Sequence, residues 1–123
     1  MIELTTFEDV FNKLISDYLG TTVEIKNKNK GLSITTLITT IDRIYIKPLE
    51  NNTNKKWIKN NKKTGVIVIA RKINAQYQTI ANIPFLLGIN TMKAVFFKSG
   101  VIIKTFDIEF TIKKLVANQK RLA

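Results

Sequence analysis

The chain has 123 residues, no cysteine and no histidine, and its 20 Lys and Arg against 9 Asp and Glu give a formal net charge of +11. The absence of cysteine and histidine excludes disulfides, thiolate nucleophiles, imidazole bases and the usual protein ligands of zinc and copper. Because most acid–base catalysis depends on histidine, the composition predicts a protein that is not an enzyme and needs neither a cofactor nor a metal.

Length and hydropathy predict one domain over residues 1–123, because domains of about 100–150 residues are the commonest size. Hydrophobic residues make up 45% of the chain. Its longest apolar stretches, 66–70 and 83–89, are far shorter than the roughly 18 residues of a membrane span. Acidic residues among the first twenty positions argue against a secretory signal. We therefore expect a soluble, intracellular (cytoplasmic) protein with no membrane partner, or a virion protein if it is a phage component.

The first predicted element is a helix over residues 7–19. An apolar residue recurs there at every third or fourth position, the pattern of a helix with one face on the core. Thr5 and Glu8 have the spacing of a capping box, and Gly20 stands where a helix C′ glycine belongs. The apolar stripe consists of Phe7, Val10, Phe11, Leu14, Ile15, Tyr18 and Leu19.

After the helix the apolar residues alternate with polar ones, which is the pattern of β-strands. Residues 22–26 are predicted as a short strand and 27–31 as a hairpin loop. Residues 32–47 are predicted as a long strand, in which a change of phase indicates a bulge or bend near 40–42. Pro48 should end that strand, because proline cannot donate to a hydrogen-bond ladder.

The second half of the chain is also predicted to be mostly strand. Residues 66–73 begin with a continuous apolar run, typical of a strand buried on both faces. Residues 92–98 and 101–112 predict a hairpin around a tight turn at 99–100. The second strand of this hairpin should bury one alternating set of side chains: Ile102, Phe106, Ile108, Phe110 and Ile112.

Three segments have less regular patterns. Residues 48–65 form a polar segment that is long for a loop in a small domain, and such loops are often functional. Residues 74–82 are ambiguous, because some of their apolar positions have helical spacing. The basic tail, residues 113–123, is predicted as a short helix.

These elements predict an α+β domain in which the N-terminal helix packs on a mainly antiparallel sheet of about five strands. A long basic loop and a short basic C-terminal tail complete the prediction. A partly open β-barrel capped by the helix is the alternative architecture.

The charge is unevenly distributed along the chain. Residues 1–24 hold one Lys and five acidic residues, a net charge of −4, whereas residues 25–123 hold 19 basic and four acidic residues, a net charge of +15. Such asymmetry favours a polyanion partner such as nucleic acid. The 17 Lys, 19 Ile and 12 Asn against only three Arg are also the composition that AT-rich codons give without selection for binding. Because Arg is the better reader of both phosphate and guanine, its scarcity argues against sequence-specific contacts.

Residues 55–63 are the most suggestive stretch for binding a polyanion, with five lysines around a single tryptophan. Lysines can neutralise phosphates, and an exposed tryptophan can stack on a base. A lone tryptophan is also commonly buried, so the alternative interpretation folds Trp57 back onto the core. The candidate nucleic-acid contacts are Lys55, Lys56, Trp57, Lys59, Lys62, Lys63, Arg71, Lys72, Lys113, Lys114, Lys120 and Arg121.

Three acidic residues lie on predicted strands: Asp42, Asp107 and Glu109. Asp107 and Glu109 lie two residues apart on a predicted strand, where their side chains could share a Mg²⁺ ion. Among basic neighbours such a pair more commonly belongs to a solvated face with salt bridges, so no metal site is assigned. Asp42 is predicted as a bend residue or as a partner for Arg71 or Lys72.

The leading hypothesis is a non-catalytic module that binds nucleic acid, or another polyanion, through backbone charge with little sequence specificity. The alternative is a structural subunit of a phage or mobile-element assembly, such as a head–tail or tail component, that docks an acidic protein neighbour. In that alternative the apolar stretch 83–89 could be an interface, and the chain could form a homo-oligomer.

Overall fold

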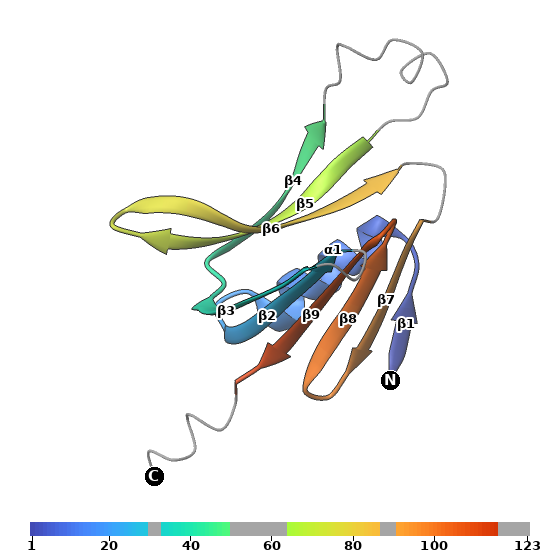
Figure 1. The fold of residues 1–123 in the computed structure, drawn as a ribbon, viewed down its shortest axis with the longest axis horizontal. Helices are drawn as coiled ribbons and strands as arrows, with labels where there is room; N and C mark the ends of the chain where they lie inside the picture. The colour runs from blue at the N-terminus through green and yellow to red at the C-terminus, as the bar shows by residue number, and fades with distance from the viewer. Residues whose placement is uncertain (30–32, 50–63, 87–90, 116–123) are drawn as a thin grey trace.

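A computed structural model describes residues 1–29, 33–49, 64–86 and 91–115. These residues form one helix and nine strands (Figure 1). The predicted α+β class, the N-terminal helix and the antiparallel pairing are confirmed, but the prediction of about five strands is wrong. The elements are β1 (Ile2–Leu4), α1 (Phe7–Tyr18), β2 (Thr22–Asn29), β3 (Ser33–Thr40), β4 (Arg43–Leu49), β5 (Thr64–Ile73), β6 (Gln76–Leu86), β7 (Met92–Phe97), β8 (Gly100–Thr105) and β9 (Ile108–Lys114).

The strands form two antiparallel sheets that share one hydrophobic core with α1. The six-stranded sheet has the order β1-β7-β8-β9-β2-β3, and the three-stranded sheet has the order β4-β5-β6. Figure 1 shows the three-stranded sheet above the helix and the six-stranded sheet. Phe7 at the start of α1 stacks on Phe85 of β6, with ring centroids 4.0 Å apart. The Thr105 hydroxyl of β8 donates to the Pro84 carbonyl of β6 at 2.8 Å. Contacts of this kind join the two sheets.

The helix follows its sequence signals with one shift. It begins at Phe7 as predicted, but Thr6, not Thr5, is the N-cap, and its hydroxyl accepts from the Asp9 amide at 3.3 Å. The capping box is therefore wrong by one residue. Gly20 has the positive φ of 85° expected of a C′ glycine. The buried side chains of α1 are Val10, Leu14 and Tyr18. This helix is too short and too polar to cross a lipid bilayer.

The predicted long strand over 32–47 is two strands that belong to different sheets. The strand is interrupted at residues 41–42, where the sequence indicated a bend. There the chain passes from β3 of the six-stranded sheet to β4 of the three-stranded sheet. The change of sheet explains why apolar residues occur in both phases of the segment. Pro48 lies within β4, opposite Gly65, and does not end the strand. Proline is tolerated there because β4 is an edge strand.

Most of the ambiguous segment 74–82, and residues 113–114 of the predicted tail helix, lie in strands. Residues 76–86 form β6, which pairs with β5 as a hairpin. The turn of this hairpin has positive φ at both Asn74 (52°) and Ala75 (67°), the mark of a type I′ turn that matches the twist of paired strands. At the C-terminal end, β9 continues to Lys114, and the rest of the tail lies outside the described residues.

Phe106 was predicted to be buried, and the structure places it at the surface. A turn at residues 106–107 separates β8 from β9, and Phe106 has a φ of 53° and is 54% exposed. The turn shifts the alternation of side chains, so Thr105 is buried and Ile102 is only partly buried. Phe110, beyond the turn, is 1% exposed, as predicted.

These two phenylalanines should therefore differ in their contribution to stability. We expect Phe110→Ala to lower the free energy of unfolding by about 3 to 5 kcal/mol, because it opens a cavity in the core. Phe106→Ala should change it by about 0.5 kcal/mol or less, as is usual for surface positions. Denaturant unfolding of both variants measures the difference. Equal losses would contradict the position of the turn.

Tyr18 at the end of α1 is a buried ionisable group. Its side chain is 1% exposed, its ring centroid lies 6.4 Å from that of Phe96, and the Lys114 ammonium lies 4.9 Å from its ring centroid. Burial, and next the negative charge of Asp17, raise the pKa of the Tyr18 hydroxyl from 10.0 to about 12. The neutral hydroxyl is therefore favoured by folding.

Stability should decrease at high pH through this residue. Between pH 10 and about 12 only the unfolded chain loses the Tyr18 proton, so ionisation favours unfolding in that window and has no effect below it. Relative to Tyr18→Phe, the unmodified chain should lose up to about 2 to 3 kcal/mol of unfolding free energy across the window. Denaturant unfolding at a series of fixed pH values measures this loss. A stability difference between the two proteins that stays constant with pH would contradict the raised pKa.

Candidate nucleic-acid interface

Only four of the candidate contacts predicted from sequence lie among the described residues. Lys55, Lys56, Trp57, Lys59, Lys62, Lys63, Lys120 and Arg121 lie outside them, so the prediction for these residues remains a prediction. Arg71 and Lys72 lie near the end of β5, and Lys113 and Lys114 near the end of β9.

The structure does not bring these two pairs together. Arg71 and Lys72 belong to the three-stranded sheet, and Lys113 and Lys114 to the six-stranded sheet. The Lys114 amide donates to the Ser99 carbonyl at 2.8 Å, which fixes the second pair beside the β7–β8 turn. In Figure 1 this end of β9 lies away from the three-stranded sheet. The four residues therefore do not form one binding surface.

The three-stranded sheet has one face on the core and one face that points away from it, which we call the outward face. Ile44, Ile67 and Ile83 belong to the core cluster. The residues that lie between these core residues along each strand point away from the core. The residues that pair with them on the neighbouring strand point to the same side. The described side chains of the outward face are Arg43, Tyr45, Lys47, Val66, Val68, Ala70, Lys72, Tyr77, Thr79, Asn82, Pro84 and Leu86. None of them is acidic.

A β-bulge on β6 brings Tyr77 to the outward face. Ile69 pairs with Ala81, but the next residue of β5, Ala70, pairs with Thr79, so Ile80 is an extra residue. Beyond this bulge the alternation of β6 is reversed. Tyr77 therefore faces the same side as its partner Lys72. Every side chain from Lys72 to Thr79 is exposed, and Figure 1 shows this hairpin projecting beyond the rest of the sheet.

Two basic and two aromatic side chains form a cluster on the outward face, which we call the Arg–Tyr cluster. The guanidinium carbon of Arg43 lies 4.4 Å from the ring centroid of Tyr45 and 5.2 Å from that of Tyr77. The Lys72 ammonium lies 5.9 Å from the Tyr77 ring. These distances are within the range of cation–π attraction. Arg43 is opposite Ala70 in the central strand, whose small side chain leaves room for an arginine reaching toward β6.

Asp42 holds the base of the cluster in place. Its amide donates to the Ala70 carbonyl at 2.9 Å, and its carboxylate accepts from the Lys72 amide at 2.7 Å. The sequence predicted Asp42 as a bend residue or a partner of Arg71 or Lys72. It is both a bend residue and a partner of Lys72, through the backbone amide of that residue.

Arg71 lies on the opposite face of the hairpin from Lys72, because neighbours on a strand point to opposite sides. Its Nε donates to the Gln78 side-chain oxygen at 2.7 Å across the hairpin. It is therefore not a member of the Arg–Tyr cluster.

Sequence reasoning missed Arg43, Tyr45 and Tyr77. The alternation of Arg43, Tyr45 and Lys47 on one side of a strand was a signal that could have found the first two residues. Tyr77 had no such signal, because its position depends on the bulge and on the pairing of β6 with β5.

Of the acidic pair near the C-terminus, Asp107 lies in the turn at 106–107, and Glu109 has basic neighbours. Glu109 of β9 stands directly opposite Lys104 of β8 and Lys28 of β2, which is the arrangement of a face with cross-strand charge pairs. Within the described residues there is no group of three or more acidic side chains that could hold a metal ion.

No protein-family model matches the chain, and no curated protein and no solved structure matches it.

The bond from Asp42 to the Lys72 amide can be tested directly. Asp42→Ala should lower the free energy of unfolding by about 1 to 2 kcal/mol, because it removes a charge-assisted hydrogen bond. It should also speed hydrogen exchange at the Lys72 amide. Asp42→Asn keeps an acceptor oxygen, so its free energy of unfolding and its hydrogen exchange at the Lys72 amide should both change less than in Asp42→Ala. Unchanged exchange at Lys72 in Asp42→Ala would contradict the role of this carboxylate.

Proposed function

We propose that the protein is a non-catalytic module that binds nucleic acid through phosphate contacts, with little sequence specificity, and that the outward face of the three-stranded sheet is its binding surface. The observation that carries the proposal is the composition of this face, which has three cations and two tyrosines and no acidic side chain among its described residues. The three cations are Arg43, Lys47 and Lys72, and all of them are exposed.

The six-stranded sheet offers a useful contrast. On its solvent face acidic residues lie among the basic ones: Lys93 lies 3.8 Å from Glu3, and Lys113 stands opposite Glu24. Positive charge on that sheet is therefore partly neutralised within the protein. A polyanion is attracted most where cations outnumber acidic neighbours. This favours the outward face, where the neighbouring Asp42 carboxylate accepts a hydrogen bond from the Lys72 backbone amide.

Low specificity follows from the chemistry of the site. Contacts from Lys to phosphate carry no sequence information, since sequence is recognised at base edges. The lysines of residues 55–63 belong to the segment that connects β4 to β5, and their participation remains a prediction. The assembly-subunit alternative, with an acidic protein partner, also remains a prediction.

The salt dependence of binding tests the proposed surface. Each phosphate contact on a single strand contributes about −0.7 to the slope of log affinity against log salt. Replacing Arg43, Lys47 and Lys72 together by Gln should therefore make the slope shallower by about 2 and weaken binding of all sequences equally. Fluorescence anisotropy with oligonucleotides at several salt concentrations gives both quantities.

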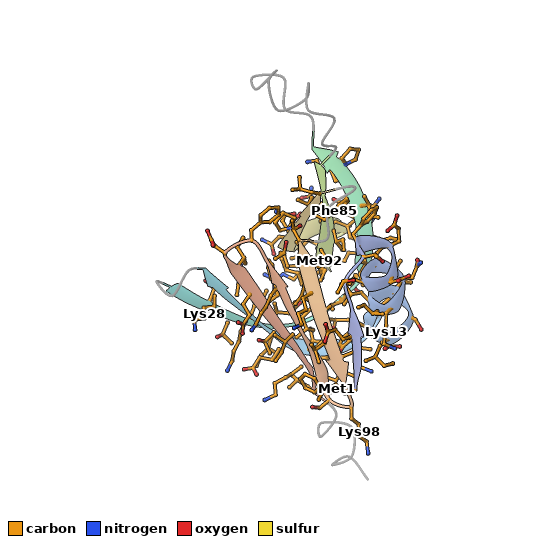
Figure 2. All side chains as sticks on the ribbon, turned by 90° about the vertical axis from the view of Figure 1, so that its right-hand side faces the viewer. Met1, Lys13, Lys28, Phe85, Met92 and Lys98 are labelled. Atoms are coloured by element: carbon orange, nitrogen blue, oxygen red, sulfur yellow. The ribbon has the colours of Figure 1, made fainter. Side chains whose placement is uncertain are left out.

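The matched control removes the same charge from the other sheet. Lys93, Lys98 and Lys104 are exposed, and Lys98 lies at the end of the molecule opposite the three-stranded sheet (Figure 2). Replacing these three by Gln should leave the slope nearly unchanged. If the slope of log affinity against log salt becomes shallower by the same amount in both triple variants, the outward face is not the site. If the unmodified protein does not bind DNA or RNA at low salt, the proposed function is wrong.

A further inference from the structure

The Arg–Tyr cluster presents aromatic surface in a way that a purely electrostatic site does not require. Tyr77 is 51% exposed at the surface of the hairpin, although a tyrosine ring usually buries much of its apolar area. Arg43 lies over the Tyr45 ring and close to the Tyr77 ring. The site thus already holds one flat cation against two aromatic rings.

We propose that the Arg–Tyr cluster is a stacking site for unpaired bases, so that the protein binds single-stranded nucleic acid in preference to duplex. This inference rests on the proposed function and names the class of nucleic acid that the outward face takes. Phosphates contact Arg43, Lys47 and Lys72, while one base stacks on the exposed Tyr77 ring beside the Arg43 guanidinium.

The chemistry of the two nucleic-acid forms decides between them. In a duplex the bases are stacked on one another and paired, and their flat surfaces cannot reach a ring on a protein sheet. In a single strand the flat surfaces are free, and aromatic side chains and Arg guanidinium groups on sheet surfaces stack on them. Every base has such a surface, so stacking retains the low sequence specificity of the proposed function.

Charge alone predicts the opposite preference. Through counterion release, each phosphate contact makes the slope of log affinity against log salt steeper by about 0.9 on B-DNA and by about 0.7 on single strands. A protein that used only lysines and arginines would therefore favour duplex. A preference for single strands would have to come from contacts with unpaired bases, and Tyr45, Tyr77 and Arg43 are the described side chains of the outward face best suited to provide them.

A strand without bases separates stacking from charge. Fluorescence anisotropy at one salt concentration compares three probes with the same number of phosphates: a single strand, an abasic single strand and a duplex. The unmodified protein should bind the single strand roughly five- to 150-fold more tightly than the abasic strand, the range expected for one stacked base. It should also favour the single strand over the duplex.

Three variants assign the effect to the cluster. Tyr77→Ala should lose most of the preference for the base-bearing strand over the abasic strand, and Tyr77→Leu, which keeps apolar bulk, should do the same. Arg43→Lys keeps the charge but not the flat guanidinium, and it should reduce the preference without changing the salt slope. Phe106→Ala, which removes an exposed aromatic residue from the other sheet, should change nothing. Melting temperatures of all four variants verify that they are folded.

The outcomes distinguish this inference from the proposed function. Equal affinity for base-bearing and abasic strands, or tighter binding of the duplex, would overturn the stacking site and leave phosphate binding intact. A preference that Tyr77→Ala and Tyr77→Leu both retain would also overturn it. Absence of binding to all three probes would overturn both proposals.

Discussion

Between β3 and β4 the chain leaves one sheet and enters the other, and the backbone hydrogen bonds of Ile41 and Asp42 tie both sheets to the end of α1. The Ile41 carbonyl accepts from the Gly20 amide at 2.8 Å, and its amide donates to the Thr21 carbonyl at 2.9 Å. The next residue, Asp42, bonds to Ala70 and Lys72 of β5. Because Ile41 is also fully buried, this junction fixes the three-stranded sheet relative to the helix and the six-stranded sheet.

The outward face depends on this junction. With one side of the three-stranded sheet fixed against the core, its other side must point away, and no described element packs on it as a neighbouring layer. Val68 and Ala70 in the central strand are nevertheless buried, at 2% and 1% exposure. Tyr45 and Asn82 flank Val68, and Arg43 and Thr79 flank Ala70. The face therefore has a small apolar centre on β5, with basic and aromatic residues beside it on β4. Such a surface combines positive charge, which attracts anions, with the exposed aromatic ring of Tyr77.

Local patterns predicted the elements, and long-range pairing decided the features that they missed. The α1 stripe and the β7–β8 hairpin follow from spacing and turn residues within a few positions of the chain. Pro48 was misjudged because its tolerance depends on β4 being at a sheet edge. Phe106 was misplaced because a turn reverses the alternation by one residue, and Tyr77 was missed because its position depends on a bulge that does the same. A pattern of period two carries no information about such a reversal, so the Arg–Tyr cluster could not be assembled from sequence.

The arginines of this chain bear more directly on the proposed function than its lysines do. AT-rich codons would give an excess of Lys without any selection for binding, but they would not determine where the few Arg residues lie. Both described arginines, Arg43 and Arg71, flank the start of the projecting hairpin, and each makes a contact suited to a flat guanidinium. Arg43 lies against two rings, and the Nε of Arg71 donates to Gln78. An ammonium group could supply the charge at both positions, but not the flat surface or the fixed direction of the donor. The positions of the arginines thus single out the hairpin and its Arg–Tyr cluster, whereas the net charge alone singles out no part of the chain.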